Sequence, residues 1–120
     1  MPSGKSNSVL VLEDDPATAN ALRALLRLSG FDAHLTSTVR DAMQALGNQP
    51  FAILDLMLPD GSGLDVLAAI QAEHPRTRAL VATASLDPRM EHEARRLGAE
   101  LVLTKPIRLT ELLGWLRAPQ

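Results

Sequence analysis

The residues best suited to chemistry in this sequence lie at the ends of short apolar runs. Glu13 and Asp14 follow one such run and Asp55 follows another, while Thr83 and Lys105 end two later ones. A carboxylate at the end of a buried strand costs free energy unless a partner or an ion neutralises it. This spacing therefore predicts that the five side chains lie at one common site.

The chemistry that these residue types predict is the binding of a phosphoryl group. Three neighbouring carboxylates repel one another, and a single lysine cannot neutralise them all. A Mg²⁺ ion would relieve the repulsion, because it takes one or two carboxylates together with water and phosphate oxygens. The ammonium of Lys105 and the hydroxyl of Thr83 are donors suited to phosphoryl oxygens. We therefore expect a Mg²⁺-dependent phosphoryl-binding site in which a carboxylate is available as the nucleophile.

The elements that must position this site follow from the alternation of two patterns. Five apolar runs typical of buried strands alternate with five amphipathic patterns typical of helices. The predicted strands are 9–12, 31–36, 51–54, 79–83 and 101–104, and the predicted helices begin near Pro16, Val39, Leu64, Arg89 and Leu109. This alternation predicts an α/β fold with parallel strands, right-handed crossovers and helices on both faces. Ligands of such sheets bind beyond the carboxyl ends of the strands, where the candidate residues lie.

The composition fits a single domain and excludes several classes of function. A net charge of −2 over 120 residues provides no basic surface for nucleic acid and no polybasic membrane patch. The absence of cysteine excludes disulfides, thiolate catalysis and cysteine-bound metal. No apolar run approaches the ~18 residues of a membrane span. We expect residues 1–7 to be a disordered tail, residues 8–118 to form one domain, and the protein to be cytoplasmic.

Taken together and in order, these motifs resemble those of the receiver domain of two-component response regulators. The similarity covers nearly the whole chain, from about Ser8 to Trp115. It rests on five pieces: Glu13-Asp14, Asp55 with the following residues 56–61, Thr83-Ala84, Gly98-Ala99 and Lys105-Pro106. The resemblance implies a CheY-like, flavodoxin-like fold with a doubly wound five-stranded parallel sheet in the strand order 2-1-3-4-5.

The resemblance also implies a role for each acid. Asp55 would receive a phosphoryl group from a sensor histidine kinase or a phosphotransfer protein. Asp14 would be the principal Mg²⁺ ligand, and Glu13 would assist through water. Asp55 and the backbone carbonyl of Met57 would complete the protein ligands. The domain would then act as a signalling switch toward a downstream effector or partner, and not as an enzyme.

The remaining motif residues would serve the phosphoryl group and the switch. Lys105 would pair with Asp55 before phosphorylation and with the phosphoryl group afterwards. Thr83 would turn inward to a phosphoryl oxygen and move the following loop. Pro106 is expected to follow a cis peptide bond.

The sequence departs from the family pattern at two positions near the lysine. Receiver domains usually carry tyrosine or phenylalanine three residues before the lysine, where this chain has Val102. The residue after the Lys-Pro pair is often phenylalanine, where this chain has Ile107. The phosphorylation chemistry is unaffected by these changes, but the family's aromatic reorientation cannot occur in its usual form.

Three other classes of protein share part of this pattern. Haloacid-dehalogenase-type phosphatases need a second aspartate two residues after the nucleophile, where this chain has Met57. A flavin-binding module on the same fold would need a loop rich in hydroxyls and glycine after the first strand, and this loop is acidic. A receiver-fold interaction domain that works without phosphorylation is favoured weakly by Val102 and opposed by the complete set of acids, threonine and lysine.

Several expectations concern helix packing. Asp15, Thr38 and Asp87 are predicted to cap helices. The apolar stripes are expected to include Leu28, Met43 and Leu109. Leucines already fill the apolar stripe of the last helix. We therefore expect Trp115 either to be partly exposed at a partner surface or to pack at the side of the helix. The three histidines, His34, His74 and His92, are expected to be exposed.

Overall fold

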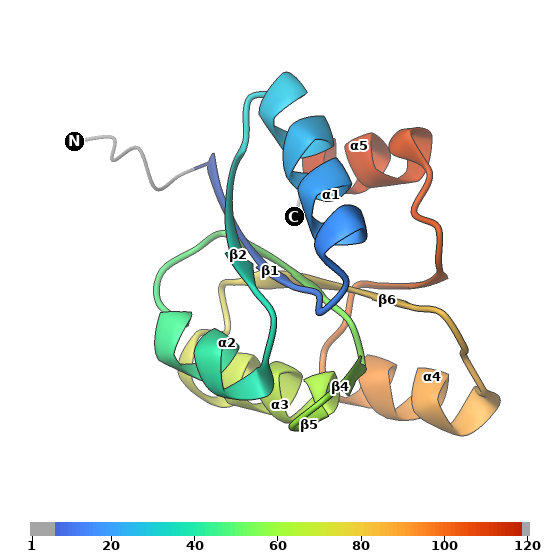
Figure 1. The fold of residues 1–120 in the computed structure, drawn as a ribbon. Coiled ribbons are helices and arrows are strands. Elements are labelled where there is room, and N and C mark those ends of the chain that lie inside the picture. Colours follow the sequence, from blue (N-terminus) through green and yellow to red (C-terminus); the bar gives the residue numbers. More distant parts are fainter. Residues whose placement is uncertain (1–6, 119–120) are drawn as a thin grey trace.

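The computed structural model describes residues 7–118 and contains one five-stranded parallel sheet. Figure 1 shows the strands at the centre of the molecule with helices above and below them. The strand order is β2-β1-β3-β6-β7, which confirms the predicted order because β6 and β7 are the fourth and fifth strands of this sheet. The strands are β1 (Ser8–Leu12), β2 (Asp32–Thr36), β3 (Phe51–Leu54), β6 (Arg78–Thr83) and β7 (Leu101–Thr104).

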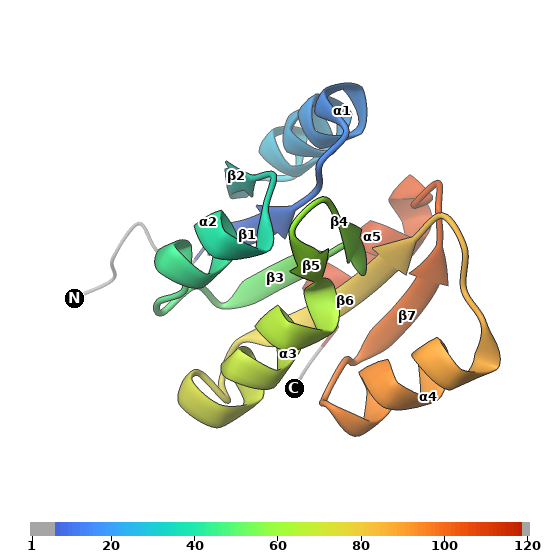
Figure 2. The same cartoon turned by 60° about the horizontal axis from the view of Figure 1, so that its bottom comes forward.

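Five helices cover the two faces of the sheet. They are α1 (Pro16–Leu28), α2 (Val39–Ala45), α3 (Gly63–Glu73), α4 (Pro88–Arg96) and α5 (Leu109–Arg117). The helices α1 and α5 lie on one face and α2, α3 and α4 on the other, as the two views show (Figures 1 and 2). Two apolar layers result, one on each face, because the strand side chains point alternately up and down. The central strands β1 and β3 are therefore buried on both faces.

A short antiparallel hairpin follows the end of β3 and was not predicted. It consists of β4 (Met57–Leu58) and β5 (Gly61–Ser62), in which Met57 pairs with Ser62 and Leu58 with Gly61. Pro59 and Asp60 form its turn, as the predicted break in the strand requires. The hairpin directs the chain from the end of β3 into α3.

Side-chain caps begin the helices where the sequence predicts them. The carboxylate of Asp15 accepts a hydrogen bond from the Thr18 N–H, and Asp87 caps α4 in the same way. Thr38 caps α2 by accepting from the Asp41 N–H. These three predictions are confirmed, because Asp and Thr oxygens satisfy amide groups that the first helical turn leaves without partners.

The predicted apolar stripes are wrong at their ends. Leu28 is 86% exposed, Leu109 is 44% exposed and Met43 is 37% exposed. Leu28 ends α1, Leu109 begins α5 and Met43 lies in the last turn of α2, where the helices face the sheet less closely. Of the histidines, His34 and His92 are exposed as predicted, while His74 is half-buried at the end of α3.

Trp115 packs into the core beneath α5, so the option of partial exposure is wrong. Its side chain is buried, its indole N–H donates to Glu100 Oε1 at 3.0 Å, and its ring meets Phe51 edge-on with centroids 5.2 Å apart. Arg78 pairs with the same glutamate at 2.8 Å and donates to the Ala118 carbonyl at 2.9 Å. Since Phe51 and Arg78 begin their strands, this group lies at the amino edge of the sheet, opposite the candidate site.

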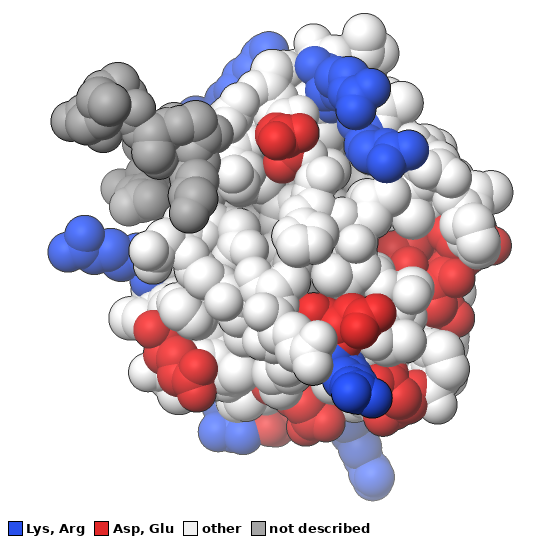
Figure 3. All heavy atoms as spheres, turned by 60° about the vertical axis from the view of Figure 1, so that its left-hand side comes forward, with Lys and Arg blue, Asp and Glu red and all other residues white. Residues whose placement is uncertain are grey.

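Charged side chains are spread over the surface. Figure 3 shows small groups of acidic and basic side chains around a broad uncharged area on one face. Among the described residues, no helix is long and apolar enough to cross a membrane. Of the predicted tail, residues 1–6 lie outside the described residues, and Asn7 donates a hydrogen bond to the Gly30 carbonyl.

Gly114 lies inside α5 in open space, so we expect Gly114→Ala to stabilise the protein. A Cβ built at this position meets no atom within 4 Å, and the residue is exposed. Alanine in a helix interior is favoured over glycine by about 0.5–1 kcal/mol because it loses less backbone entropy on folding. Urea unfolding should show a higher midpoint with an unchanged slope. A lower midpoint would mean that α5 is packed more closely at Gly114 than the structure has it.

Candidate functional site

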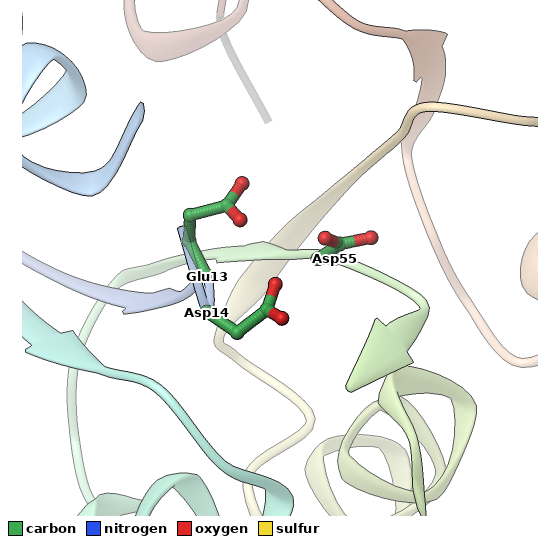
Figure 4. A group of neighbouring side chains, drawn as sticks. All are labelled: Glu13, Asp14 and Asp55. Atoms are coloured by element: carbon green, nitrogen blue, oxygen red, sulfur yellow. The ribbon is translucent and has the colours of Figure 1, made fainter. Parts of the chain in front are cut away.

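Three carboxylates meet beyond the carboxyl ends of β1 and β3. One oxygen from each of Glu13, Asp14 and Asp55 lies within 4.8 Å of the others. Figure 4 shows the three side chains around a common space at this edge of the sheet. The parallel register of β1 and β3 places Leu12 opposite Leu54, so the acids that follow these two leucines lie side by side.

The three acids differ in burial, and the difference suits a hydrated cation. Glu13 and Asp55 are 5% and 7% exposed, whereas Asp14 is exposed to solvent. A hard divalent cation keeps several of its waters and prefers carboxylate oxygens. The set of two buried acids and one accessible acid therefore fits Mg²⁺, and Asp14 is the acid that solvent can reach.

Lys105 lies between the two buried acids. Its ammonium donates to Asp55 Oδ2 at 2.8 Å and also to Glu13 Oε1. Partial burial alone would lower the pKa of Lys105, but the hydrogen bonds to Asp55 and Glu13 outweigh burial and raise that pKa above its usual value. The lysine is therefore held in its charged form. Its single positive charge balances only one of the two carboxylates that it binds, and Asp14 adds a further negative charge.

The backbone holds Asp55 in place through close contacts that the sequence did not reveal. The Asp55 N–H donates to the Leu12 carbonyl at 2.9 Å, and the Met57 N–H approaches Asp55 Oδ1 at 3.3 Å. Gly63, the first residue of α3, packs directly against this segment. A Cβ on Gly63 would lie 1.9 Å from the Asp55 carbonyl oxygen, so only glycine fits there.

Asp60 anchors the hairpin turn to the beginning of α2. Its two carboxylate oxygens accept from the N–H groups of Val39 at 2.8 Å and Arg40 at 3.0 Å. These two backbone hydrogen bonds lower the pKa of Asp60. The anchor fixes the far end of the loop that begins at Asp55. The sequence indicated only that Asp60 belongs to a Pro-Asp-Gly turn, and not that it contacts α2.

Replacing Asp60 by alanine is expected to lower stability at neutral pH. Because the pKa of this carboxyl is lowered on folding from its ordinary value of 3.8, its contribution is fully present above that value and is lost as the pH falls below it. The urea midpoints of the wild type and of Asp60→Ala should therefore converge as the pH is lowered from neutral to about 3. A gap that stays constant over this range would contradict the role given to the charged carboxylate.

Thr83 ends β6, the strand next to β3, and is fully buried. Its hydroxyl donates to the Ser85 carbonyl at 3.4 Å, and among the described residues it makes no hydrogen bond to the three acids. The Thr83 carbonyl accepts from the Lys105 N–H at 2.8 Å and ties the ends of β6 and β7 together. The Lys105–Pro106 peptide bond is cis, as predicted.

Val102 lies inside the core between β7 and α4. It is 7% exposed and pairs in register with Val81. The helix above it contributes Ala94 as its one fully buried side chain, with Met90 partly buried. An aliphatic side chain of this size has no polar group to relocate and no ring to turn outward.

Comparisons with known proteins decide the family. Residues 9–117 match the family model described as the response regulator receiver domain. This chain belongs to that family. It is 37% identical over 112 residues to the response regulator protein PilR of Pseudomonas aeruginosa and, over the same length, to the transcriptional regulatory protein KdpE of Mycobacterium tuberculosis. The receiver fold and its place in two-component signalling are thus shown.

The alignments cover different shares of the two sides. They include 88% and 92% of this chain but 25% of PilR and 49% of KdpE, so the chain spans half or less of these relatives. Among solved structures, a response regulator from Burkholderia pseudomallei with a phosphorylated aspartic acid, a calcium ion and citrate has a TM-score of 0.86 and 25% identity. That match covers 93% of this chain and 67% of the other.

Proposed function

We propose that this receiver domain accepts a phosphoryl group on Asp55 from a sensor histidine kinase or a phosphotransfer protein, in a Mg²⁺-dependent reaction. The observation that carries the proposal is the geometry around Asp55. Its buried carboxylate is bound by Lys105 at 2.8 Å and lies beside the exposed Asp14. A nucleophile, a fixed cation and an accessible metal ligand are the groups that phosphoryl transfer requires.

Each step has a residue of this chain to carry it. An oxygen of Asp55 attacks phosphorus, the bond from phosphorus to the donor's histidine nitrogen breaks, and the electron pair leaves with that nitrogen. Lys105 then moves its hydrogen bond from Asp55 to an oxygen of the transferred group. A Mg²⁺ ion held by Asp14, Asp55 and the Met57 carbonyl, with Glu13 assisting through water, would neutralise charge on the phosphoryl oxygens. Water later cleaves the acyl phosphate and restores the carboxylate.

The transferred group provides the signal through Thr83. The Thr83 hydroxyl exchanges its long contact with the Ser85 carbonyl for a phosphoryl oxygen, which releases the loop between β6 and α4. That loop leads to α4, which buries only Ala94, so its position is easier to change than that of α1, α3 or α5. We propose that a downstream effector protein or domain recognises this change.

Other parts of the proposal follow from the same residues. The domain covers residues 8–118, acts in the cytoplasm, and contacts neither nucleic acid nor membrane directly. It is a switch rather than a haloacid-dehalogenase-type phosphatase, because Met57 cannot serve as a general acid.

A second candidate is an interaction domain that works without phosphorylation. The observation that favours it is the buried Val102, which removes the aromatic side chain of the usual switch.

Asp14→Asn is expected to stabilise the metal-free protein and to abolish its response to Mg²⁺. Removing one of three clustered negative charges relieves repulsion of about 0.5–1 kcal/mol. In the wild type, Mg²⁺ binds only the folded cluster and raises Tm with concentration, whereas the variant should show little shift. Asp32→Asn, at an exposed position on β2, is the matched control and should respond like the wild type.

Beryllofluoride, an analogue of the phosphoryl group, tests the proposed acceptor directly. Together with Mg²⁺ it should raise Tm further in the wild type and leave Asp55→Asn unchanged. Equal shifts in both proteins, or none in either, would favour the interaction domain that works without phosphorylation.

A further inference from the structure

A cavity of about 380 Å³ opens beside Asp55 on the α1 and α5 face of the sheet. Its floor consists of Val11, Ile53 and Ala82, and its sides are formed by Leu22 of α1 and Ile107 in the connection from β7 to α5. Apart from the polar end with Glu13, Asp55 and Lys105, and from Thr18, the lining is aliphatic. Water is poorly held in such a space because it finds few polar partners, so an apolar group is the favoured occupant.

The polar end of the cavity carries an excess of negative charge. Glu13, Asp55 and Lys105 all line it, and one ammonium faces two carboxylates. These carboxylates are 5% and 7% exposed, so few water molecules screen them. A positively charged group at this end is attracted, and a negatively charged one is repelled.

We propose that this cavity is a binding site for a small organic ammonium ion with an aromatic or branched alkyl body. The body fills the aliphatic space between α1 and Ile107, and the ammonium faces Glu13 and Asp55. The cavity shares Asp55 and Lys105 with the candidate phosphorylation site, so an occupant also controls access to both. The titrations use the unphosphorylated protein without Mg²⁺, so either proposal can fail without the other.

Three probes of the same shape and different charge test the proposal. Benzylamine, benzyl alcohol and benzoate share one ring and differ only in carrying a positive charge, no charge or a negative charge at neutral pH. Titrations followed by ¹H–¹⁵N spectra in an amine-free buffer give the three dissociation constants and the residues that respond. For a ligand of about eight non-hydrogen atoms we expect a dissociation constant of about 1 mM for benzylamine. Benzyl alcohol should bind more weakly, and benzoate at least about tenfold more weakly.

Two cavity-filling variants locate the site. Ile107→Phe and Ala21→Leu enlarge side chains that line the cavity from its two sides, and each should weaken benzylamine binding about tenfold or more. Ala24→Leu is the matched control, because Ala24 is exposed on the same helix outside the cavity. It should bind benzylamine as the wild type does. Melting curves confirm that each variant is folded before it is titrated.

The outcomes separate clearly. The order benzylamine, benzyl alcohol, benzoate, together with loss of binding in either folded cavity variant, establishes the site. Equal binding of benzylamine and benzoate overturns the charge argument. Absence of benzylamine binding to the wild type, or binding that survives both cavity variants, overturns the site itself.

Discussion

Gly63→Ala is expected to destabilise the protein by about 3 kcal/mol or more, the largest effect expected at any glycine that the structure describes. The added Cβ would lie 1.9 Å from the Asp55 carbonyl oxygen, 2.9 Å from the Asp55 carbonyl carbon and 3.2 Å from the Leu56 Cα. All three are backbone atoms, so no flexible side chain can move aside. Either α3 must retreat from β3, or Asp55 must shift away from Lys105.

The measurement is the urea midpoint of Gly63→Ala beside that of Gly114→Ala. Both variants add one methyl group to a glycine within a helix, but only the first meets backbone atoms. Opposite changes in stability are therefore expected from the same chemical substitution. If Gly63→Ala proved as stable as the wild type, the close approach of α3 to the end of β3 would be wrong.

Gly63→Ala should also weaken the binding of a phosphoryl analogue at Asp55. Because Gly63 contacts the main chain of Asp55 itself, a folded variant that relieves the clash by shifting Asp55 also displaces the carboxylate that Lys105 binds. We therefore expect the folded fraction of Gly63→Ala to bind beryllofluoride more weakly than the wild type does.

The sequence allowed the strands and the candidate residues to be predicted because both depend on local signals. Apolar runs of four to six residues locate the five strands, and caps such as Asp15 and Asp87 locate helix starts. Parallel topology then brings the residues at the strand ends to one edge of the sheet. For this reason the sequence predicts that Glu13, Asp14, Asp55 and Lys105 lie together at the carboxyl edge of the sheet.

Features that depend on contacts between distant segments could not be predicted. The anchor from Asp60 to Val39 joins a turn to a helix that lies 21 positions earlier, and nothing in either segment indicates the other. The requirement for glycine at position 63 depends on how closely α3 approaches β3. Sequence spacing shows that a turn is needed there, but not which backbone atoms meet.

The stripe of α5 illustrates a different failure. Four leucines already satisfy helical periodicity, so nothing in the pattern favours Trp115 as a core residue. In the structure, Leu109 is exposed, and Trp115 takes a place against Phe51 where its indole N–H reaches Glu100. A large ring with one donor buries more area than a leucine and still satisfies its polar atom. This packing makes Trp115 fluorescence a reporter of the amino edge rather than of the phosphorylation site.

Asp55→Asn is expected to abolish phosphorylation completely, which is the second large effect. Amide nitrogen and oxygen cannot replace a carboxylate oxygen as the nucleophile, so no acyl phosphate can form. Asp14 cannot take over, because it is assigned to the metal. Asp65→Asn, an exposed aspartate on α3, is the matched control and should accept the phosphoryl group as the wild type does.

Intact mass after incubation with Mg²⁺ and acetyl phosphate tests the central claim most directly. The wild type and Asp65→Asn should each gain one phosphoryl group, which is lost at high pH and is not acquired when Mg²⁺ is removed. Asp55→Asn should gain none. An adduct of equal yield on Asp55→Asn, or an unchanged mass of the wild type with Mg²⁺ and acetyl phosphate present, would contradict the account.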